Sequence, residues 1–162
     1  LTKDLIKGVL SLANAANVDV VVDPKKDNFW QYKEVALFKP NRKELAEANR
    51  VDVNALSNLK HLEAIMQQTK RKLQCDQLIV TLSEDGIASL DSENTFLHRP
   101  ALSQPITDVC GAGDSVFASV IDATKNALTT DEILHRCLLA GKAACAVQGT
   151  YVLRREDLEG KA

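Results

Sequence analysis

The chain lacks a surplus of charge of either sign, because its 20 basic residues nearly balance its 22 acidic residues and leave a formal net charge of −2. Proteins that bind nucleic acid or anionic membranes through bulk electrostatics need a strongly basic surface. We therefore expect neither partner. No apolar run approaches the roughly 20 residues of a membrane-spanning helix, and no signal-peptide pattern opens the chain. Any phosphate site must be built locally.

Cysteine is also scarce, with four residues in the chain. Their spacings match neither a zinc site nor a dense disulfide framework. We therefore expect reduced thiols that pack as small hydrophobic groups in a cytoplasmic protein. The three histidines show no ligand spacing either and are interpreted as structural.

Helix-like and strand-like segments alternate along the chain, which predicts an α/β domain with a mainly parallel sheet. No repeat, low-complexity tract or linker divides the chain, so we expect a single domain over residues 1–162. Asn41 is a plausible helix N-cap, with Glu44 at the capping-box position. We expect helices at residues 2–16, 59–73, 111–126 and 130–147, strands at 18–22, 35–38 and 77–82, and a hairpin from 86–90 to 95–98.

One segment, residues 106–117, has a composition that points to chemistry. Gly111 and Gly113 flank Ala112 where a helix is expected to begin, although glycine there costs up to roughly 1 kcal/mol relative to alanine. The first four N–H groups of a helix lack internal partners, and the terminus carries about half a positive charge. Small side chains would let a phosphate or a developing oxyanion reach these donors.

Asp114 follows the last of these glycines and falls within the first helical turn. A carboxylate there can accept the proton of a hydroxyl group that attacks a phosphate. The alternative is that Asp114 only favours the helix dipole while the glycines form a tight turn. The motif is neither a Walker A loop nor the Rossmann spacing, so the residues alone leave both interpretations open.

Residues 108–114 resemble the C-terminal signature of the ribokinase-like (PfkB) sugar kinases, and three further segments match that family in order. Residues 40–44 resemble its Asn-x-x-Glu element, which is associated with magnesium and phosphate binding. Residues 80–86 resemble the strand and turn that line the nucleotide pocket. Residues 140–149 resemble the helix and turn that close over adenine. The resemblance implies the C-terminal portion of a three-layer α/β/α sandwich.

The resemblance also implies roles for individual residues. It makes Asp114 the catalytic base and assigns the anion hole to Gly111, Ala112 and Gly113. It implies ATP and Mg²⁺ as cofactors, with Glu44 and Asn41 holding the metal through water. It leaves K⁺ open, with Asp108 near a monovalent-cation loop. The residues implied for nucleotide binding are Lys25, Thr81, Ser83, Gly86 and Gly149.

Each of these residues also has a simpler interpretation. Asn41 and Glu44 could only cap a helix. Lys25 follows a strand end, where α/β sheets place ligands, but a lone lysine there could simply be solvated. Asp108 could be an ordinary turn residue. Cys110 stands where the family commonly has threonine, and it is either a small buried side chain or a redox-sensitive thiol.

The closest likeness within the family is to the heptose-phosphate kinase branch, through residues 22–32, 36–41, 81–86 and 149–150. That branch resembles the kinase half of bifunctional ADP-heptose synthases. It implies phosphoryl transfer from ATP to the anomeric hydroxyl of a heptose 7-phosphate. Lys26 departs from the branch pattern, which has glycine there, and Gly141 stands where asparagine is frequent. The alternatives are a fructose, ribose or nucleoside kinase, an inactive nucleotide-binding fragment, and a purely structural or interaction domain.

All four matched segments belong to the C-terminal half of the family. We therefore expect this chain to be a fragment, or half of a split gene, whose N-terminal half carries most sugar contacts. The resemblance implies that N-terminal half as a partner, besides ATP and a sugar or sugar phosphate. It also implies a homodimer formed through a lid in that half.

Overall fold

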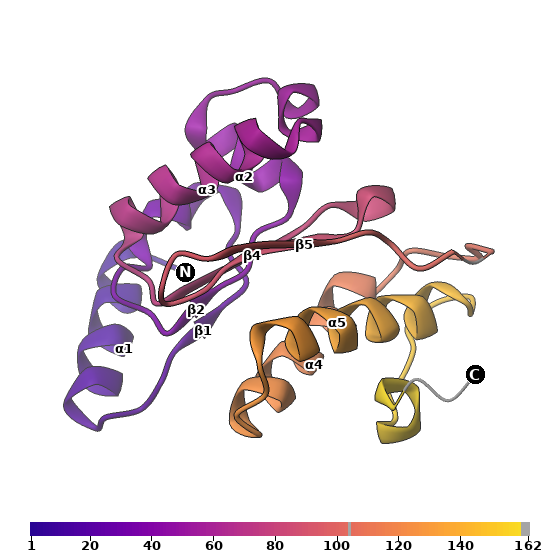
Figure 1. Ribbon diagram of the computed structural model, residues 1–162. Helices are drawn as coiled ribbons and strands as arrows, with labels where there is room; N and C mark the ends of the chain where they lie inside the picture. Colours follow the sequence, from indigo (N-terminus) through magenta and orange to yellow (C-terminus); the bar gives the residue numbers. More distant parts are fainter. Residues whose placement is uncertain (104, 160–162) are drawn as a thin grey trace. The chain divides into compact units, whose positions relative to one another are not determined.

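A computed structural model of the protein describes residues 1–103 and 105–159. Its sheet has five strands in the order β1-β2-β3-β4-β5, and β1, β2 and β3 are parallel (Figure 1). The predicted α/β class with a mainly parallel sheet is confirmed. The strands are β1 (Val21–Val22), β2 (Leu37–Phe38), β3 (Gln77–Thr81), β4 (Ile87–Leu90) and β5 (Phe96–Arg99). The α-helices are α1 (Lys3–Ala15), α2 (Arg42–Asn49), α3 (Leu59–Leu73), α4 (Ala112–Lys125) and α5 (Thr130–Cys145).

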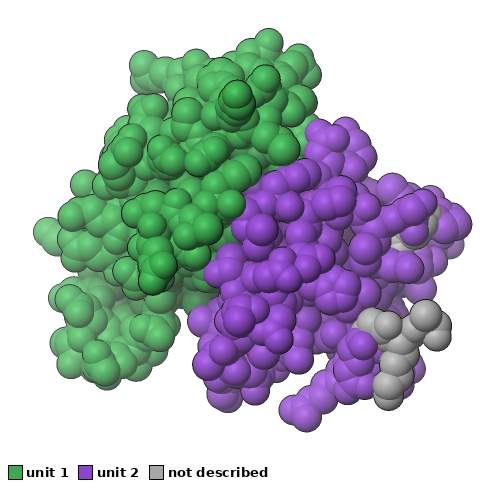
Figure 2. All heavy atoms as spheres, in the orientation of Figure 1, with its two compact units in different colours: residues 1–82, 89–96 green, residues 83–88, 97–162 purple. Residues whose placement is uncertain are grey.

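The chain divides into two compact units, and each is described by itself (Figure 2). Unit 1 comprises Leu1–Leu82 and Ser89–Phe96, and unit 2 comprises Ser83–Ala88 and Leu97–Ala162. That the whole chain acts as one domain stays a prediction.

The core of unit 1 forms around the parallel strands. β2 and β3 are short apolar runs that are almost wholly buried, as expected of parallel strands covered on both faces. Phe38 of β2 meets the ring of Phe29 edge-on, with the ring centroids 4.9 Å apart. The ammonium group of Lys72 lies 3.6 Å from the ring centre of Trp30. These contacts favour packing as the role of the aromatic residues near Trp30.

The helix ends of unit 1 follow local sequence signals. Asn41 and Glu44 form the predicted capping box, because each side chain accepts a hydrogen bond from the other's backbone N–H at 2.8 Å. Arg50 and Gln74 end α2 and α3 in the left-handed conformation. The last turn of α3 carries Lys70, Arg71 and Lys72, which complement the helix dipole.

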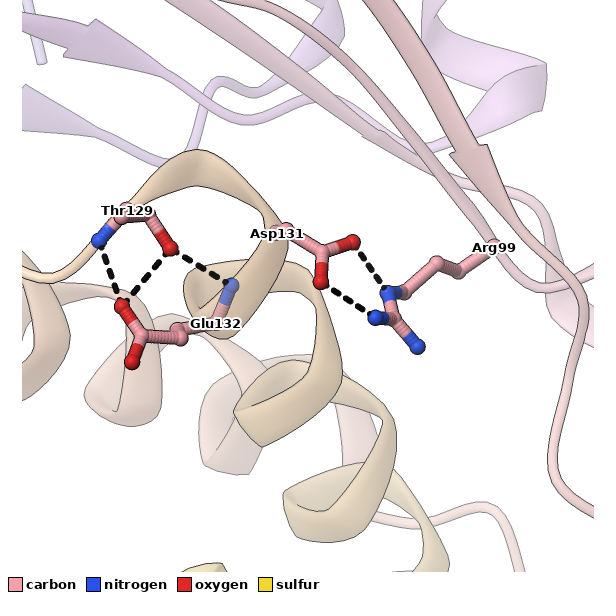
Figure 3. Close-up of polar contacts among 4 residues, drawn as sticks. All are labelled: Arg99, Thr129, Asp131 and Glu132. Atoms are coloured by element: carbon pink, nitrogen blue, oxygen red, sulfur yellow. Dashed lines mark hydrogen bonds and ion pairs between the residues drawn. The ribbon is translucent and has the colours of Figure 1, made fainter.

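Unit 2 is built on α4 and α5, which pack against each other. A Cβ at Gly141 of α5 would lie 3.5 Å from a methyl group of Val116, an ordinary van der Waals distance, so the packing of the two helices does not require glycine there. Thr129 caps α5 in a second capping box with Glu132, and Arg99 at the end of β5 donates to Asp131 (Figure 3). The Arg99 hydrogen bond lowers the pKa of Asp131. These contacts attach the start of α5 to the end of β5.

Several element boundaries differ from the predictions. The strands predicted at residues 18–22 and 35–38 are reduced to Val21–Val22 and Leu37–Phe38, the residues that pair with each other in parallel register. α5 ends at Cys145 instead of residue 147. The sequence patterns did not predict the 3₁₀ helices, because such short turns have no apolar period of their own. They are Lys26–Gln31, Val53–Ser57, Ser83–Asp85 and Arg155–Leu158.

All four cysteines carry free thiols. Cys75 and Cys137 are buried, as predicted for small hydrophobic groups. The prediction of a buried side chain is wrong for Cys110, which is exposed because it lies in the turn that precedes α4. Within the described ranges, no helix combines the length and apolar character needed to cross a bilayer.

Candidate functional site

The start of α4 provides bare backbone donors beside a carboxylate. Gly111 is the N-cap and takes a left-handed conformation with φ +74°, which favours glycine. The N–H groups of Gly113 and Asp114 have no acceptor among the described residues, and the first bond back to Gly111 comes from Ser115 at 2.9 Å. A Cβ at Gly113 would meet nothing within 4 Å. Both residues are exposed, so an anion can approach these donors.

The structure changes the predicted anion hole in one respect. The N–H of Ala112 donates to the carbonyl of Val109 at 3.3 Å and is therefore partly engaged in the turn. The N–H groups of this turn that have no acceptor among the described residues are those of Gly111, Gly113 and Asp114. The anion-hole role of Gly111, Ala112 and Gly113 stays a prediction, to which the N–H of Asp114 is now added.

Asp108 organises the loop that leads into this helix. One carboxylate oxygen accepts the N–H of Cys110 at 3.0 Å, and the other accepts the N–H of Gly149 at 2.9 Å. These hydrogen bonds, with Gly149 contributing most, lower the pKa of Asp108. Thr107 adds a backbone bond to Cys145 at 2.8 Å. The loop before α4 is therefore attached to the segment that follows α5.

This attachment bears on two predicted site residues. Both oxygens of Asp108 accept backbone N–H groups, which makes it more than an ordinary turn residue; its role near a monovalent cation stays a prediction. Gly149 has φ +79° and gives its N–H to Asp108, so a nucleotide contact there would have to use another atom. The neighbouring Thr150 lies close to Gly111. A Cβ built at Gly111 would lie 3.6 Å from the side-chain methyl group of Thr150.

Three further predicted site residues lie at the end of β3 and directly after it. Thr81, in unit 1, forms an isolated parallel bridge with Asn41, and its N–H donates to the Pro40 carbonyl at 3.2 Å. Ser83, in unit 2, is exposed and has φ +54°, an uncommon conformation for serine. Such backbone conformations cluster at ligand sites, which is compatible with the predicted nucleotide role.

Gly86 has a backbone reason to be glycine. Its φ is +95°, and a Cβ there would lie 2.0 Å from the carbonyl oxygen of Arg99. The family resemblance assigned Gly86 to the nucleotide pocket, and that assignment stays a prediction. The backbone conformation and the local packing alone already make any other residue at this position strongly unfavourable.

The Asn41–Glu44 pair fits a magnesium site in part. Asn41 commits its side-chain oxygen to the cap, and Glu44 commits one carboxylate oxygen, whereas its second oxygen has no partner in the described part of the chain. No group of three His, Cys, Asp or Glu side chains able to hold a metal occurs among the described residues. Magnesium usually keeps several waters and takes one or two carboxylates plus substrate phosphates. Glu44 suits such an ion better than Asn41 does.

An ion pair between a buried lysine and a half-buried aspartate, at the carboxyl ends of β1 and β2, was not predicted from the sequence. The side chain of Lys39 is only 3% exposed, and its ammonium group lies 3.0 Å from an oxygen of Asp23. Lys25, which the resemblance favoured, is 80% exposed and lies 3.9 Å from the other oxygen of Asp23. The signal was available, since Lys39 directly follows a buried strand, at the edge where α/β sheets bind ligands.

The predicted site residues therefore fall into two groups. Unit 1 brings Asn41, Glu44 and Thr81 together at the ends of β2 and β3, with Lys25 after β1. The remaining residues belong to unit 2, where Asp108 joins the start of α4 to Gly149.

Comparison with known proteins places this geometry in a family. The profile described as pfkB family carbohydrate kinase matches residues 1–156. The protein is 31% identical over 159 residues to "Bifunctional protein HldE" of Sulfurimonas denitrificans, covering 98% of this chain and 32% of that protein. It is 34% identical over 158 residues to the protein of the same name from Aliarcobacter butzleri, with the same coverage. The chain thus spans about a third of the length of these relatives.

Solved structures show the same fold. Phosphofructokinase-2 of Escherichia coli in complex with potassium superposes with a TM-score of 0.87 at 20% identity, over 98% of this chain and 51% of that one. Ribokinase of Arabidopsis thaliana, complexed with ribose and ATP, superposes with a TM-score of 0.77 at 16% identity, over 92% of this chain and 48% of that one. These neighbours confirm the ribokinase-like α/β/α fold. By the family profile, the chain belongs to the pfkB family of carbohydrate kinases.

Proposed function

We propose that this chain is the nucleotide-binding and catalytic part of an ATP-dependent kinase that phosphorylates the anomeric hydroxyl of a heptose 7-phosphate. The observation that carries the proposal is the exposed Asp114 beside the unpaired N–H groups at the start of α4. The heptose branch is supported by the likeness of residues 22–32 and 36–41 to that branch. It is also supported by relatives named HldE that match nearly the whole chain.

In this reaction the sugar hydroxyl oxygen forms a bond to the γ-phosphorus of ATP, while the bond from that phosphorus to the bridging oxygen of ADP breaks. Asp114 would accept the hydroxyl proton as the oxygen attacks. The N–H groups of Gly113 and Asp114 would donate to the oxygens of the transferring phosphoryl group, where negative charge is concentrated. Thr81, Ser83 and Lys25 would line the nucleotide site.

Glu44, through its uncommitted carboxylate oxygen, would hold water around Mg²⁺, which would neutralise charge on the triphosphate when bound. Asn41 would then keep Glu44 oriented through the capping box. Asp108 would hold the anion-binding loop in place, and a K⁺ ion beside that loop is part of the same proposal. The protein would act in the cytoplasm together with an N-terminal half, and homodimerisation would involve that half.

The decisive experiment uses the complete kinase that contains this chain. Phosphorus NMR should show a phosphate ester at the anomeric position after incubation with Mg-ATP and a heptose 7-phosphate. Asp114→Asn should lower kcat by about 10²–10⁴, the range for loss of a general base. Its affinity for Mg-ATP should stay unchanged in calorimetric titration. Asp4→Asn is the matched control, because Asp4 is also in the first turn of a helix, α1.

Other outcomes separate the alternatives. Turnover of fructose 6-phosphate, ribose or a nucleoside, with none of the heptose phosphate, would refute the substrate and keep the kinase. Binding of Mg-ATP by the 162-residue chain without turnover would identify that chain alone as an inactive nucleotide-binding fragment. A complete protein that neither binds ATP nor loses activity on Asp114→Asn would be a structural or interaction domain.

A further inference from the structure

The parallel pairing of β2 with β3 continues beyond the ends of both strands. Within the strands, Leu37 lies opposite Gln77. The isolated bridge between Asn41 and Thr81 keeps the same register. The N–H of Thr81 also donates to the Pro40 carbonyl at 3.2 Å. The segment that leads into α2 is therefore joined to the end of β3, and a predicted metal residue lies opposite a predicted nucleotide residue.

Arg42 extends this pairing by one residue through its side chain. The backbone of Arg42 already belongs to α2, but one terminal guanidinium nitrogen donates to the carbonyl of Leu82 at 2.9 Å. These two residues are 40 apart along the chain, and the same separation holds between Asn41 and Thr81. The other terminal nitrogen donates to the hydroxyl of Ser57 at 3.2 Å, in the 3₁₀ helix that precedes α3.

The guanidinium group suits this bridging position because of its shape and its surroundings. It is planar and presents its N–H donors in a rigid fork, so two acceptors fix its orientation. The side chain of Arg42 is half-buried and Leu82 is only 1% exposed. Hydrogen bonds in such surroundings are electrostatically stronger than hydrogen bonds in water. Arg42 therefore fixes the first turn of α2 relative to the end of β3.

These two segments carry different parts of the proposed site. Glu44, in the first turn of α2, would hold the water around Mg²⁺. Thr81, the last residue of β3, would line the nucleotide site. One Mg-ATP complex can use both residues only if their separation matches the distance between the metal ion and the nucleotide contact. A displacement of about 1 Å, even one caused far from the chemistry, can lower a rate by about 10²-fold.

We propose that Arg42 is a positioning residue that holds Thr81 and Glu44 at the separation required by Mg-ATP, and so couples the binding of the metal ion to that of the nucleotide. Arg42 would act through the Leu82 carbonyl, without touching the nucleotide. The pattern Asn-x-x-Glu leaves position 42 unspecified, so the family resemblance did not predict this role. The inference rests on the proposed function, because it uses the metal role of Glu44 and the nucleotide role of Thr81.

The test measures how strongly the complete kinase binds ATP with and without Mg²⁺. Calorimetric titration gives the two dissociation constants, and their ratio measures the coupling between metal ion and nucleotide. Arg42→Met keeps the aliphatic stem and removes every donor. It should lower this ratio by about tenfold, a usual size for coupling between two sites. The KM for Mg-ATP should rise with it, whereas the KM for the sugar and the affinity for metal-free ATP should stay unchanged.

Two further variants make the test specific. Arg50→Met removes the same charge from an exposed residue at the other end of α2, and it should change the ratio by less than about twofold, as surface substitutions do. Arg42→Lys can still donate to the Leu82 carbonyl but lacks the fork, so it should recover most of the lost coupling. Should Arg42→Met fail to fold, Arg42→Gln tests the same loss with a shorter polar side chain.

A second readout needs no nucleotide. In the 162-residue chain alone, Arg42→Met should make the Thr81 amide exchange its hydrogen about fivefold faster, the effect of losing one ordinary hydrogen bond on local opening. Amides in the middle of α3 should exchange at the rate of the unmodified chain. They are the control for a general loss of stability.

A complete kinase that binds Mg-ATP and keeps its coupling ratio in Arg42→Met would refute this inference and leave the proposed function standing. Equal loss of affinity for metal-free and Mg-bound ATP would refute it as well, and so would α3 amides accelerated as much as that of Thr81, because both results assign Arg42 to stability alone. A complete kinase that binds no ATP would overturn the proposed function, and this inference with it.

Discussion

Gly86→Ala should strongly destabilise the protein. The methyl group would lie 2.0 Å from the Arg99 carbonyl oxygen and 2.6 Å from the backbone of Pro100 and Ala101. These are backbone atoms, so no side-chain rotation can relieve the clash. The backbone φ of +95° is also unfavourable for alanine.

The two effects give a magnitude. Holding a non-glycine residue in a rare backbone region costs about 1–3 kcal/mol, and inserting a methyl group into packed atoms costs about 1–3 kcal/mol. The expected loss of unfolding free energy is therefore about 2–6 kcal/mol. For a chain of this size, a loss near the middle of that range lowers Tm by on the order of 10 °C.

Urea unfolding followed by circular dichroism measures this loss, with Gly8→Ala as the control. The same substitution at Gly8 meets no atom within 4 Å and lies inside α1, so it should stabilise the isolated chain by about 0.5–1 kcal/mol. Gly86→Ala and Gly8→Ala are thus expected to change the free energy of unfolding in opposite directions. A Gly86→Ala variant within about 0.5 kcal/mol of the parent, the range of ordinary surface changes, would refute this account of the turn.

Three further predictions follow from the charges and thiols. Lys39→Met should lower the free energy of unfolding, measured in urea, by about 1–3 kcal/mol because it removes a buried partner of Asp23. The control Lys25→Met changes an 80% exposed side chain and should lower it by less than about 0.5 kcal/mol. The hydrogen bonds from Gly149 and Cys110 hold the pKa of Asp108 below its ordinary value. The Asp108 carboxylate therefore stabilises the folded protein above its unfolded-state pKa, and this stabilisation is lost as the pH falls through its folded-state pKa. Asp108→Asn should therefore flatten the stability profile below about pH 4, and an unchanged acid slope would contradict this role. Burial raises the pKa of Cys75 to about 11, so mass spectrometry after brief iodoacetamide treatment at pH 8 should find Cys110 alkylated and Cys75 intact; the reverse order would contradict the packing.

The sequence predicted those parts of the molecule that depend on local signals. The capping box of Asn41 and Glu44 needs only four residues, and the glycine-rich start of α4 needs only a helix and its first turn. Long amphipathic helices such as α3 were found because their apolar period is visible over many residues. In each case the interaction partners are close together in the chain.

The missed features depend on partners that are distant in sequence. Asp108 accepts a hydrogen bond from the N–H of Gly149, 41 residues away, and no local sequence pattern near Asp108 predicts that contact. Buried Lys39 pairs with Asp23, which directly follows the neighbouring strand β1, and this pairing depends on the sheet register. Gly86 resembled a nucleotide-pocket residue, although the carbonyl of Arg99 alone already requires glycine there. Sequence patterns identified these positions but not the contacts they make.

The structure also discriminates between the two aspartates of the signature at residues 108–114. A general base must have an oxygen free to take a proton, at a position that a hydroxyl group can reach. Both carboxylate oxygens of Asp108 accept hydrogen bonds from backbone N–H groups, and these bonds disfavour protonation of Asp108. Asp114 is exposed, and its carboxylate has no partner among the described residues. Asp114 is therefore the aspartate that we propose as the proton acceptor, while Asp108 holds the loop before α4 through its two hydrogen bonds.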